Sequence, residues 1–182
     1  MRPSGMDTVE LFPHPVRLRI VHAMSGGRAL TTGELCKRFP DVPKATMYRH
    51  VAALHDGGVL EIVDERRVHS VLERRYRLLE ANTRIDPDRI ASMSADEHRR
   101  LFGVAMATLL AEFNAYLDRD GSDPAADQVS YLQTTLWLDP GELAELVADV
   151  RAAIKARTRN EPSPGRSPHL ISPVLFPTEP PT

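Results

Sequence analysis

The chain has 182 residues with an apolar share of 42 %, enough for one large domain or two small ones with a real core. It contains no run of eighteen apolar residues, so no membrane-spanning helix is expected, and its N-terminus lacks the apolar stretch of a secretory signal. The single cysteine, Cys36, excludes an internal disulfide and is typical of a reducing cytosol, so a cytoplasmic location is expected.

The net charge of −2 hides an asymmetry along the chain. Residues 1–80 carry 13 Lys and Arg against 10 Asp and Glu, whereas residues 81–182 carry 10 against 15. Phosphate binding needs local rather than global positive charge. The first part could therefore contact nucleic acid, and the second part would repel it.

Residues 1–11 are expected to form a flexible arm. A helix is then predicted from Pro15, because the text PVRLRIVHAM places apolar residues four apart and a glycine pair ends the pattern. Thr31 and Glu34 form a capping-box pattern that begins a second, short helix, TGELCKRF. The sequence PDVP, residues 40–43, is expected to end that helix, because the residue before a proline disfavours the helical conformation.

A third helix is predicted from Pro43 to Asp56, with a glycine pair after its end. Its inward face carries Met47, Val51 and Leu54. Its outward face carries Lys44, Thr46, Tyr48, Arg49 and His50. Such a helix suits the DNA major groove, which is about 12 Å wide, and an arginine such as Arg49 can make a bidentate contact to guanine.

The texts VLEIVDE and SVLERRYRLL predict two antiparallel strands. The tip between them carries Arg66 and Arg67, which could reach DNA phosphates or the minor groove; the alternative is an ordinary solvated hairpin tip. Three helices followed by two strands predict a winged helix-turn-helix over residues 12–80. The expected fold class is therefore mainly α with a small β wing (α+β).

Residues 81–157 are expected to form an α/β dimerisation region. A long helix from Ala95 to about Arg119 has a broader apolar face than one small domain needs to cover. A second subunit is the natural cover, so a homodimer is expected. The predicted interface residues are Leu101, Phe102, Met106, Leu109, Leu110, Phe113 and Leu117.

A strand, VSYLQTTLWLD, and a helix from Pro140 are predicted to complete this region. Tyr116, Tyr131 and Trp137 could line a pocket for an unidentified small-molecule effector; alternatively they are core and interface aromatics. Residues 158–182 contain seven prolines and are expected to be a disordered tail.

Three texts, PHPVRLRIVHAM, TTGELCKRFPDVPKATMYRHVAALHDGGVLEIV and ERRYRL, resemble the winged helix-turn-helix of ArsR-like transcription regulators. The resemblance covers about 70 residues and implies a dimeric, sequence-specific DNA-binding regulator. It implies that the DNA-facing residues are Lys44, Thr46, Tyr48, Arg49 and His50, with Arg66 and Arg67 on the wing. Metal-sensing members resemble one another in cysteine pairs, which this chain lacks, so neither a metal nor a cofactor is expected.

None of the P-loop, GxGxxG, GxSxG and HExxH motifs occurs, so an enzyme is not expected. Two functions remain open. The favoured one is a homodimeric regulator of transcription that binds double-stranded DNA, with repression as the favoured mode. The alternative is a winged-helix protein-interaction module without DNA affinity, which the small positive excess of residues 1–80 supports.

Overall fold

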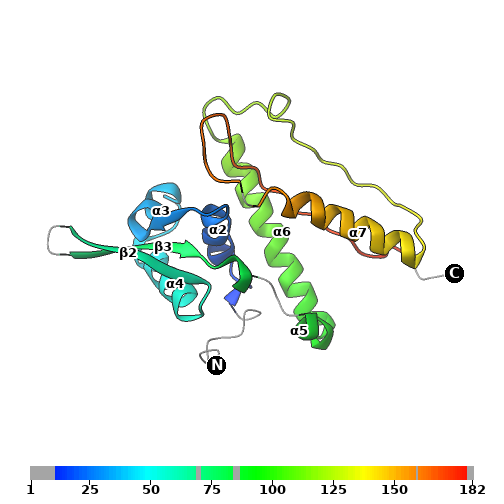
Figure 1. Cartoon of the computed structure of the whole chain (residues 1–182), viewed down its shortest axis with the longest axis horizontal. Coiled ribbons are helices and arrows are strands. Elements are labelled where there is room, and N and C mark those ends of the chain that lie inside the picture. The colour runs from blue at the N-terminus through cyan, green and yellow to red at the C-terminus, as the bar shows by residue number, and fades with distance from the viewer. Residues whose placement is uncertain (1–10, 69–70, 84–86, 159, 180–182) are drawn as a thin grey trace. The chain divides into compact units, whose positions relative to one another are not determined.

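The computed structural model describes residues 11–68, 71–83, 87–158 and 160–179. The chain divides into two compact units, residues 1–114 and residues 115–182. The first unit contains the helices and the small sheet of a winged helix, followed by a long helix (Figure 1). The fold class expected from the sequence is confirmed.

Two short helices open the described part of the first unit. Helix α2 (Pro15–Met24) begins after His14, whose Nδ1 accepts a hydrogen bond from the amide of Val16 at 3.2 Å. Helix α3 (Thr32–Arg38) has the predicted capping box at its start. The amide of Glu34 donates to the Thr31 hydroxyl at 3.1 Å, and the amide of Thr31 donates to the Glu34 carboxylate at 2.7 Å.

Helix α4 (Lys44–Asp56) follows Pro43 and ends at Gly57, which confirms the third predicted helix. Gly58 has a φ of +71°, a conformation that a glycine adopts without strain. A Cβ atom at Gly57 would overlap the side chain of Leu11, which is fully buried. The prediction of a flexible arm is therefore wrong at Leu11, because its side chain fills space that the glycine leaves open; residues 1–10 lie outside the described residues.

The wing is an antiparallel sheet with the strand order β1-β3-β2. It consists of β1 (Ala29–Thr31), β2 (Leu60–Val68) and β3 (Val71–Leu78). Strand β1 was not expected from the sequence, and it pairs with β3. A register shift lies at Val63, because Ile62 pairs with Tyr76 whereas Asp64 pairs with Arg75.

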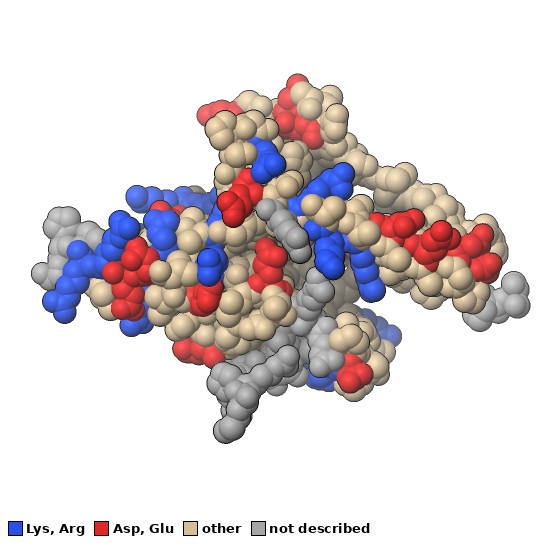
Figure 2. Space-filling model, viewed as in Figure 1, with Lys and Arg blue, Asp and Glu red and all other residues tan. Residues whose placement is uncertain are grey.

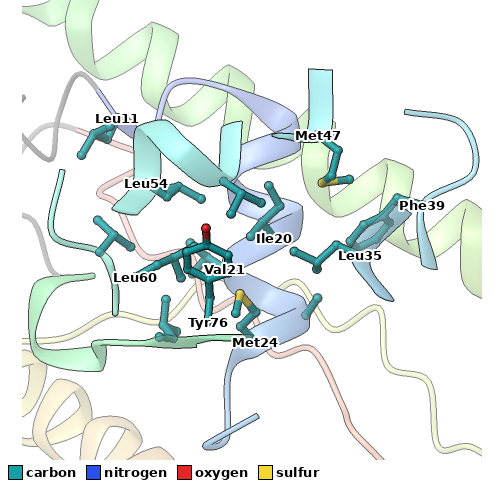
Figure 3. Packing of buried hydrophobic residues seen from close by; sticks show 14 of the residues in the cluster. Leu11, Ile20, Val21, Met24, Leu35, Phe39, Met47, Leu54, Leu60 and Tyr76 are labelled. Carbon is teal, nitrogen blue, oxygen red and sulfur yellow. The ribbon is translucent and has the colours of Figure 1, made fainter. Parts of the chain in front are cut away.

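One hydrophobic core joins the three helices to the sheet (Figure 3). Ile20 and Met24 of α2, Leu35 of α3 and Leu54 of α4 are all fully buried in it, and Tyr76 closes it from β3. The sulfur of Cys36 has no partner cysteine, and Cys36 packs against the same core. The core fixes α4 on the helices behind it and leaves the opposite face of α4 exposed.

A 3₁₀ turn (Glu80–Asn82) and helix α5 (Pro87–Ser92) lead to helix α6 (Ala95–Leu117), which confirms the long predicted helix. Ser94 and Glu97 cap its start, with the amide of Ser94 donating to the carboxylate of Glu97 at 2.8 Å. One side of α6 is covered, since Thr108 is fully buried. One turn further, Glu112 accepts a hydrogen bond from Arg19 of α2 at 3.2 Å.

The second unit contains helix α7 (Pro140–Lys155), which confirms the last predicted helix. Asp139 accepts from the amide of Glu142 at 2.9 Å in a second capping box. The strand predicted at residues 129–139 is wrong: the segment has no regular structure, because a strand needs a neighbouring strand for its backbone hydrogen bonds and none pairs with it here. Tyr131 and Trp137 are 71 % and 81 % exposed.

Residues 160–179 form neither helix nor strand, and the disorder expected for the tail stays a prediction. Within the described part of the chain, no helix combines the length and the hydropathy that a membrane span requires.

Candidate nucleic-acid interface

The outer face of α4 is the first part of the site. Its exposed or half-exposed polar residues are Lys44, Thr46, Tyr48 and Arg49. Tyr48 is 58 % exposed. Ala45 and Ala52 are exposed on the same side of the helix, and their small side chains let another molecule approach the backbone between the polar ones. Sequence reasoning missed both alanines because they carry no polar group.

His50 does not belong to that face. It is only 3 % exposed and lies on the buried side of α4 with Met47, Val51 and Leu54. The prediction that His50 points outward is wrong, because its ring stacks on the ring of His14 at the start of α2. The two ring centroids are 4.0 Å apart with an interplanar angle of 46°.

Four basic side chains meet where α2 begins beside α4. We call His14, Arg17, Arg49 and His50 the His–Arg cluster. Burial is the main cause that lowers the pKa of His50 to about 4, and the charges of His14, Arg17 and Arg49 lower it further. Burial, followed by the charges of the two arginines, also lowers the pKa of His14. Both imidazoles are therefore neutral at pH 7.

His14 and Arg17 were not among the residues expected at the site. The text HPVR marks the start of a helix, but only the packing of α2 against α4 brings this helix start to the recognition surface. Arg17 is half-buried, and one of its guanidinium nitrogens donates to the carbonyl of Leu11 at 3.0 Å.

The wing arginines lie in strand β2 and not in the hairpin tip, which is a correction to the sequence interpretation. The strand continues to Val68 because it pairs with β3 as far as Val71, so the tip lies at residues 69–70, outside the described residues. Arg66 donates to Asp64 at 2.7 Å although its side chain is 78 % exposed. Arg67 is exposed.

The other arginines of the wing form ion pairs. Arg74 donates to Glu65 at 2.8 Å, and Arg77 donates to Glu61 across the sheet at 2.7 Å. Basic and acidic side chains accordingly alternate over the wing (Figure 2). The wing therefore has little net charge, whereas Lys44 and Arg49 on the outer face of α4 form no ion pair with another described residue.

The apolar residues of α6 divide between two sides of the helix. Leu101 lies two helical turns before Thr108 and on the same side, which is the covered one. Phe102, Leu110 and Leu117 are 49 %, 60 % and 43 % exposed. Their spacing places them, with the half-exposed Met106 and Phe113, on the opposite side. We call this exposed set the α6 stripe: Phe102, Met106, Leu110, Phe113 and Leu117.

Comparison with protein families gives an independent result for this site. Residues 14–63 match the model of a helix-turn-helix domain, a stretch that begins at His14 and ends within β2. The match contains both the outer face of α4 and the whole His–Arg cluster. The chain therefore carries a helix-turn-helix domain of the kind found in DNA-binding regulators. A comparison with curated proteins found no match.

Proposed function

We propose that the protein is a sequence-specific transcription regulator of the ArsR-like class that binds double-stranded DNA as a homodimer through α4. The observation that carries the proposal is the exposed polar face of α4 within a matched helix-turn-helix domain. In this class of domain the second helix of the pair lies in the major groove. Arg49 and Tyr48 then face base edges, and Lys44, at the start of the helix, faces the backbone.

The homodimer is supported by apolar side chains that stay partly or largely exposed in the part of the chain that the structure describes. The α6 stripe is one such surface. In the second unit, none of the described residues is buried, although α7 places Leu143, Leu146, Val147 and Val150 at helical spacing. An amphipathic helix without cover needs a partner surface, and a second copy of the chain supplies one.

Repression is the mode of regulation that we favour, because a dimer bound across two major grooves occupies the DNA that a polymerase needs. An effector would act by changing the distance or angle between the two α4 helices, which shifts the population between dimer geometries. The hydrogen bond between Arg19 and Glu112 joins the helix-turn-helix to α6 and offers a route for such a change.

Salt-dependent binding to a mixed-sequence duplex tests the proposal. The affinity should fall linearly on a logarithmic plot as salt rises, because each Lys or Arg that neutralises a phosphate releases a condensed counterion. Fluorescence anisotropy from 50 to 300 mM salt provides the measurement. A flat response at negligible affinity would contradict DNA binding.

Such a flat response would favour the second function, a winged helix that binds another protein. The ion pairs of the wing are the observation in its favour, because they leave fewer free cations for phosphates than the sequence count suggests.

A further inference from the structure

Residues 129–138, with the sequence VSYLQTTLWL, expose large apolar side chains and adopt no regular structure. Leu132 and Trp137 are 82 % and 81 % exposed, and Leu136 is 55 % exposed. No backbone hydrogen bond joins residues 132–138 to another described residue. A contiguous exposed apolar segment whose backbone groups are also unpaired is typical of an interaction surface. We call residues 129–138 the unpaired segment.

The composition of the unpaired segment favours an extended strand. Valine, threonine, tyrosine and tryptophan are enriched in strands, and the segment contains no glycine, no proline and no charged residue. Side chains alternate between the two faces of a strand. One face of the extended segment would therefore carry the leucines and the other face the aromatic residues: Leu132, Leu136 and Leu138 against Tyr131 and Trp137.

A strand also needs an edge to pair with. Among the strands that the structure describes, β1 and β2 each have a free edge, because β3 lies between them. Strand β1 has only three residues, and five of the nine residues of β2 are charged. Neither edge matches an uncharged segment of ten residues. The same segment of a second copy matches it in length, and two uncharged segments meet without like-charge repulsion.

Two-fold symmetry restricts how two copies of the segment can pair. Residues opposite one another in an antiparallel pair share a face, so the two-fold axis must pass beside a single residue type and not between two neighbours. An axis at Thr134 places Leu132 opposite Leu136 and Tyr131 opposite Trp137. Of the symmetric registers, this one pairs the most large apolar side chains, and such cross-strand pairs stabilise a sheet.

We propose that the unpaired segments of two copies form an antiparallel strand pair centred on Thr134 in the homodimer. This inference rests on the proposed function, which supplies the homodimer. A ribbon of two strands is only marginally stable on its own and needs a helix to pack against. Helix α7 begins directly after the segment, and its apolar side chains supply a surface for the leucine face. The α6 stripe supplies the larger part of the association free energy.

Disulfide trapping tests the register directly. Cys36→Ala removes the only cysteine of the chain, and Thr134→Cys or Thr135→Cys is then introduced into that background. Both threonines are exposed, so neither change should disturb the single chain. The two Thr134 residues would have Cα atoms about 4.5–5.5 Å apart, within the range of about 4.4–6.8 Å for a disulfide. The two Thr135 residues would be diagonal neighbours about 7–8 Å apart, beyond that range.

Under mild oxidation, Thr134→Cys should form a cross-linked dimer at least about tenfold faster than Thr135→Cys, as measured on non-reducing gels. Thr135→Cys is the matched control, since it carries the same thiol one residue away. Equal rates, or a faster reaction of Thr135→Cys, would overturn this strand pair.

A charged substitution gives a second measurement. Leu136→Glu would place a carboxylate opposite Leu132 of the other copy, so the dissociation constant of the dimer should rise by at least about tenfold in sedimentation equilibrium. Leu170→Glu is the matched control, because it adds the same charge at a leucine that is 45 % exposed and lies outside the segment. An unchanged dissociation constant in Leu136→Glu would contradict the pairing.

The two levels of the account fail in different ways. A wild-type dimer without selective cross-linking at Thr134 overturns this inference alone, and the α6 stripe then remains the proposed interface. A wild-type chain that stays monomeric overturns the homodimer of the proposed function and the strand pair with it.

Discussion

Arg19 of α2 joins Asp41, in the turn before α4, to Glu112 of α6. Its two terminal nitrogens donate to both oxygens of Asp41 at 2.5 and 3.1 Å, and its Nε donates to Glu112 at 3.2 Å. The guanidinium also lies 4.5 Å from the centroid of the Phe39 ring. One side chain therefore links the turn that positions the recognition helix to the helix that we expect at the dimer interface.

Replacing Arg19 tests how much this link contributes to the fold. Its side chain is only 12 % exposed and that of Glu112 is 19 % exposed, so Arg19→Met leaves a largely buried carboxylate without its donor. We expect a loss of about 2 kcal/mol in the free energy of unfolding, measured by urea denaturation. Asp41→Asn should cost less, since the Asp41 side chain is 59 % exposed. A variant Arg19→Met as stable as the wild type would contradict this role.

Replacing Arg49 tests whether this side chain contacts base edges. Arg49→Ala should leave stability within about 0.5 kcal/mol, because the side chain is exposed. The discrimination between a preferred and a scrambled duplex should fall by about 1–3 kcal/mol, the value of one bidentate contact. Competition titrations with the two duplexes provide the measurement, with Arg99→Ala as the control. Undiminished discrimination in Arg49→Ala would remove Arg49 from base readout.

A charged substitution in the α6 stripe tests whether this surface forms the dimer interface. Leu110 is its most exposed member at 60 %, so Leu110→Glu should leave the fold of one chain intact while placing a charge in the interface. Sedimentation velocity should then detect monomers. Ala107→Glu is the matched control, because Ala107 is also exposed but lies to one side of the stripe. A dimer that persists in Leu110→Glu would exclude the stripe as the interface.

His50 carries a prediction for acid stability. Its pKa in the folded chain, about 4, lies below the ordinary value of 6.5, so the folded state favours the neutral ring. The contribution of the neutral ring is present above pH 6.5 and is lost as the pH falls towards 4, by roughly 3 kcal/mol in all. Denaturation curves at pH 7.5, 5.5 and 4.5 should show this loss. His50→Phe should lose less stability over the same range, and an equal loss would contradict the prediction.

The helices of the winged domain could be predicted because their signals are local. Pro43 and the glycine pair mark the two ends of α4, and Thr31 with Glu34 marks the start of α3. A strand depends instead on a neighbouring strand, which explains why β1 was missed and why a strand was wrongly predicted at residues 129–139. Strand β1 has three residues, too few for an alternating pattern, and it forms because β3 lies beside it. The segment at residues 129–139 has strand-forming residues but no strand beside it.

The candidate site was less predictable, because two of its residues depend on packing between helices. His50 was assigned to the outer face of α4 because it is polar, although it lies three residues after Met47 and four before Leu54, a spacing that places it on the buried side. The partner of its ring could not be predicted, because His14 lies 36 residues earlier, at the start of α2, and only packing brings the two rings together. The role of Leu11 against Gly57 depends on tertiary packing in the same way.

Selection of preferred sites from random duplexes by the wild-type chain tests the central claim most directly. If two α4 helices related by a two-fold axis enter successive major grooves, the enriched sequence is a palindrome. Its half-sites should lie one helical turn, about 34–36 Å, or a multiple of it apart. Enrichment of no sequence above the starting pool would contradict the proposal that α4 reads DNA.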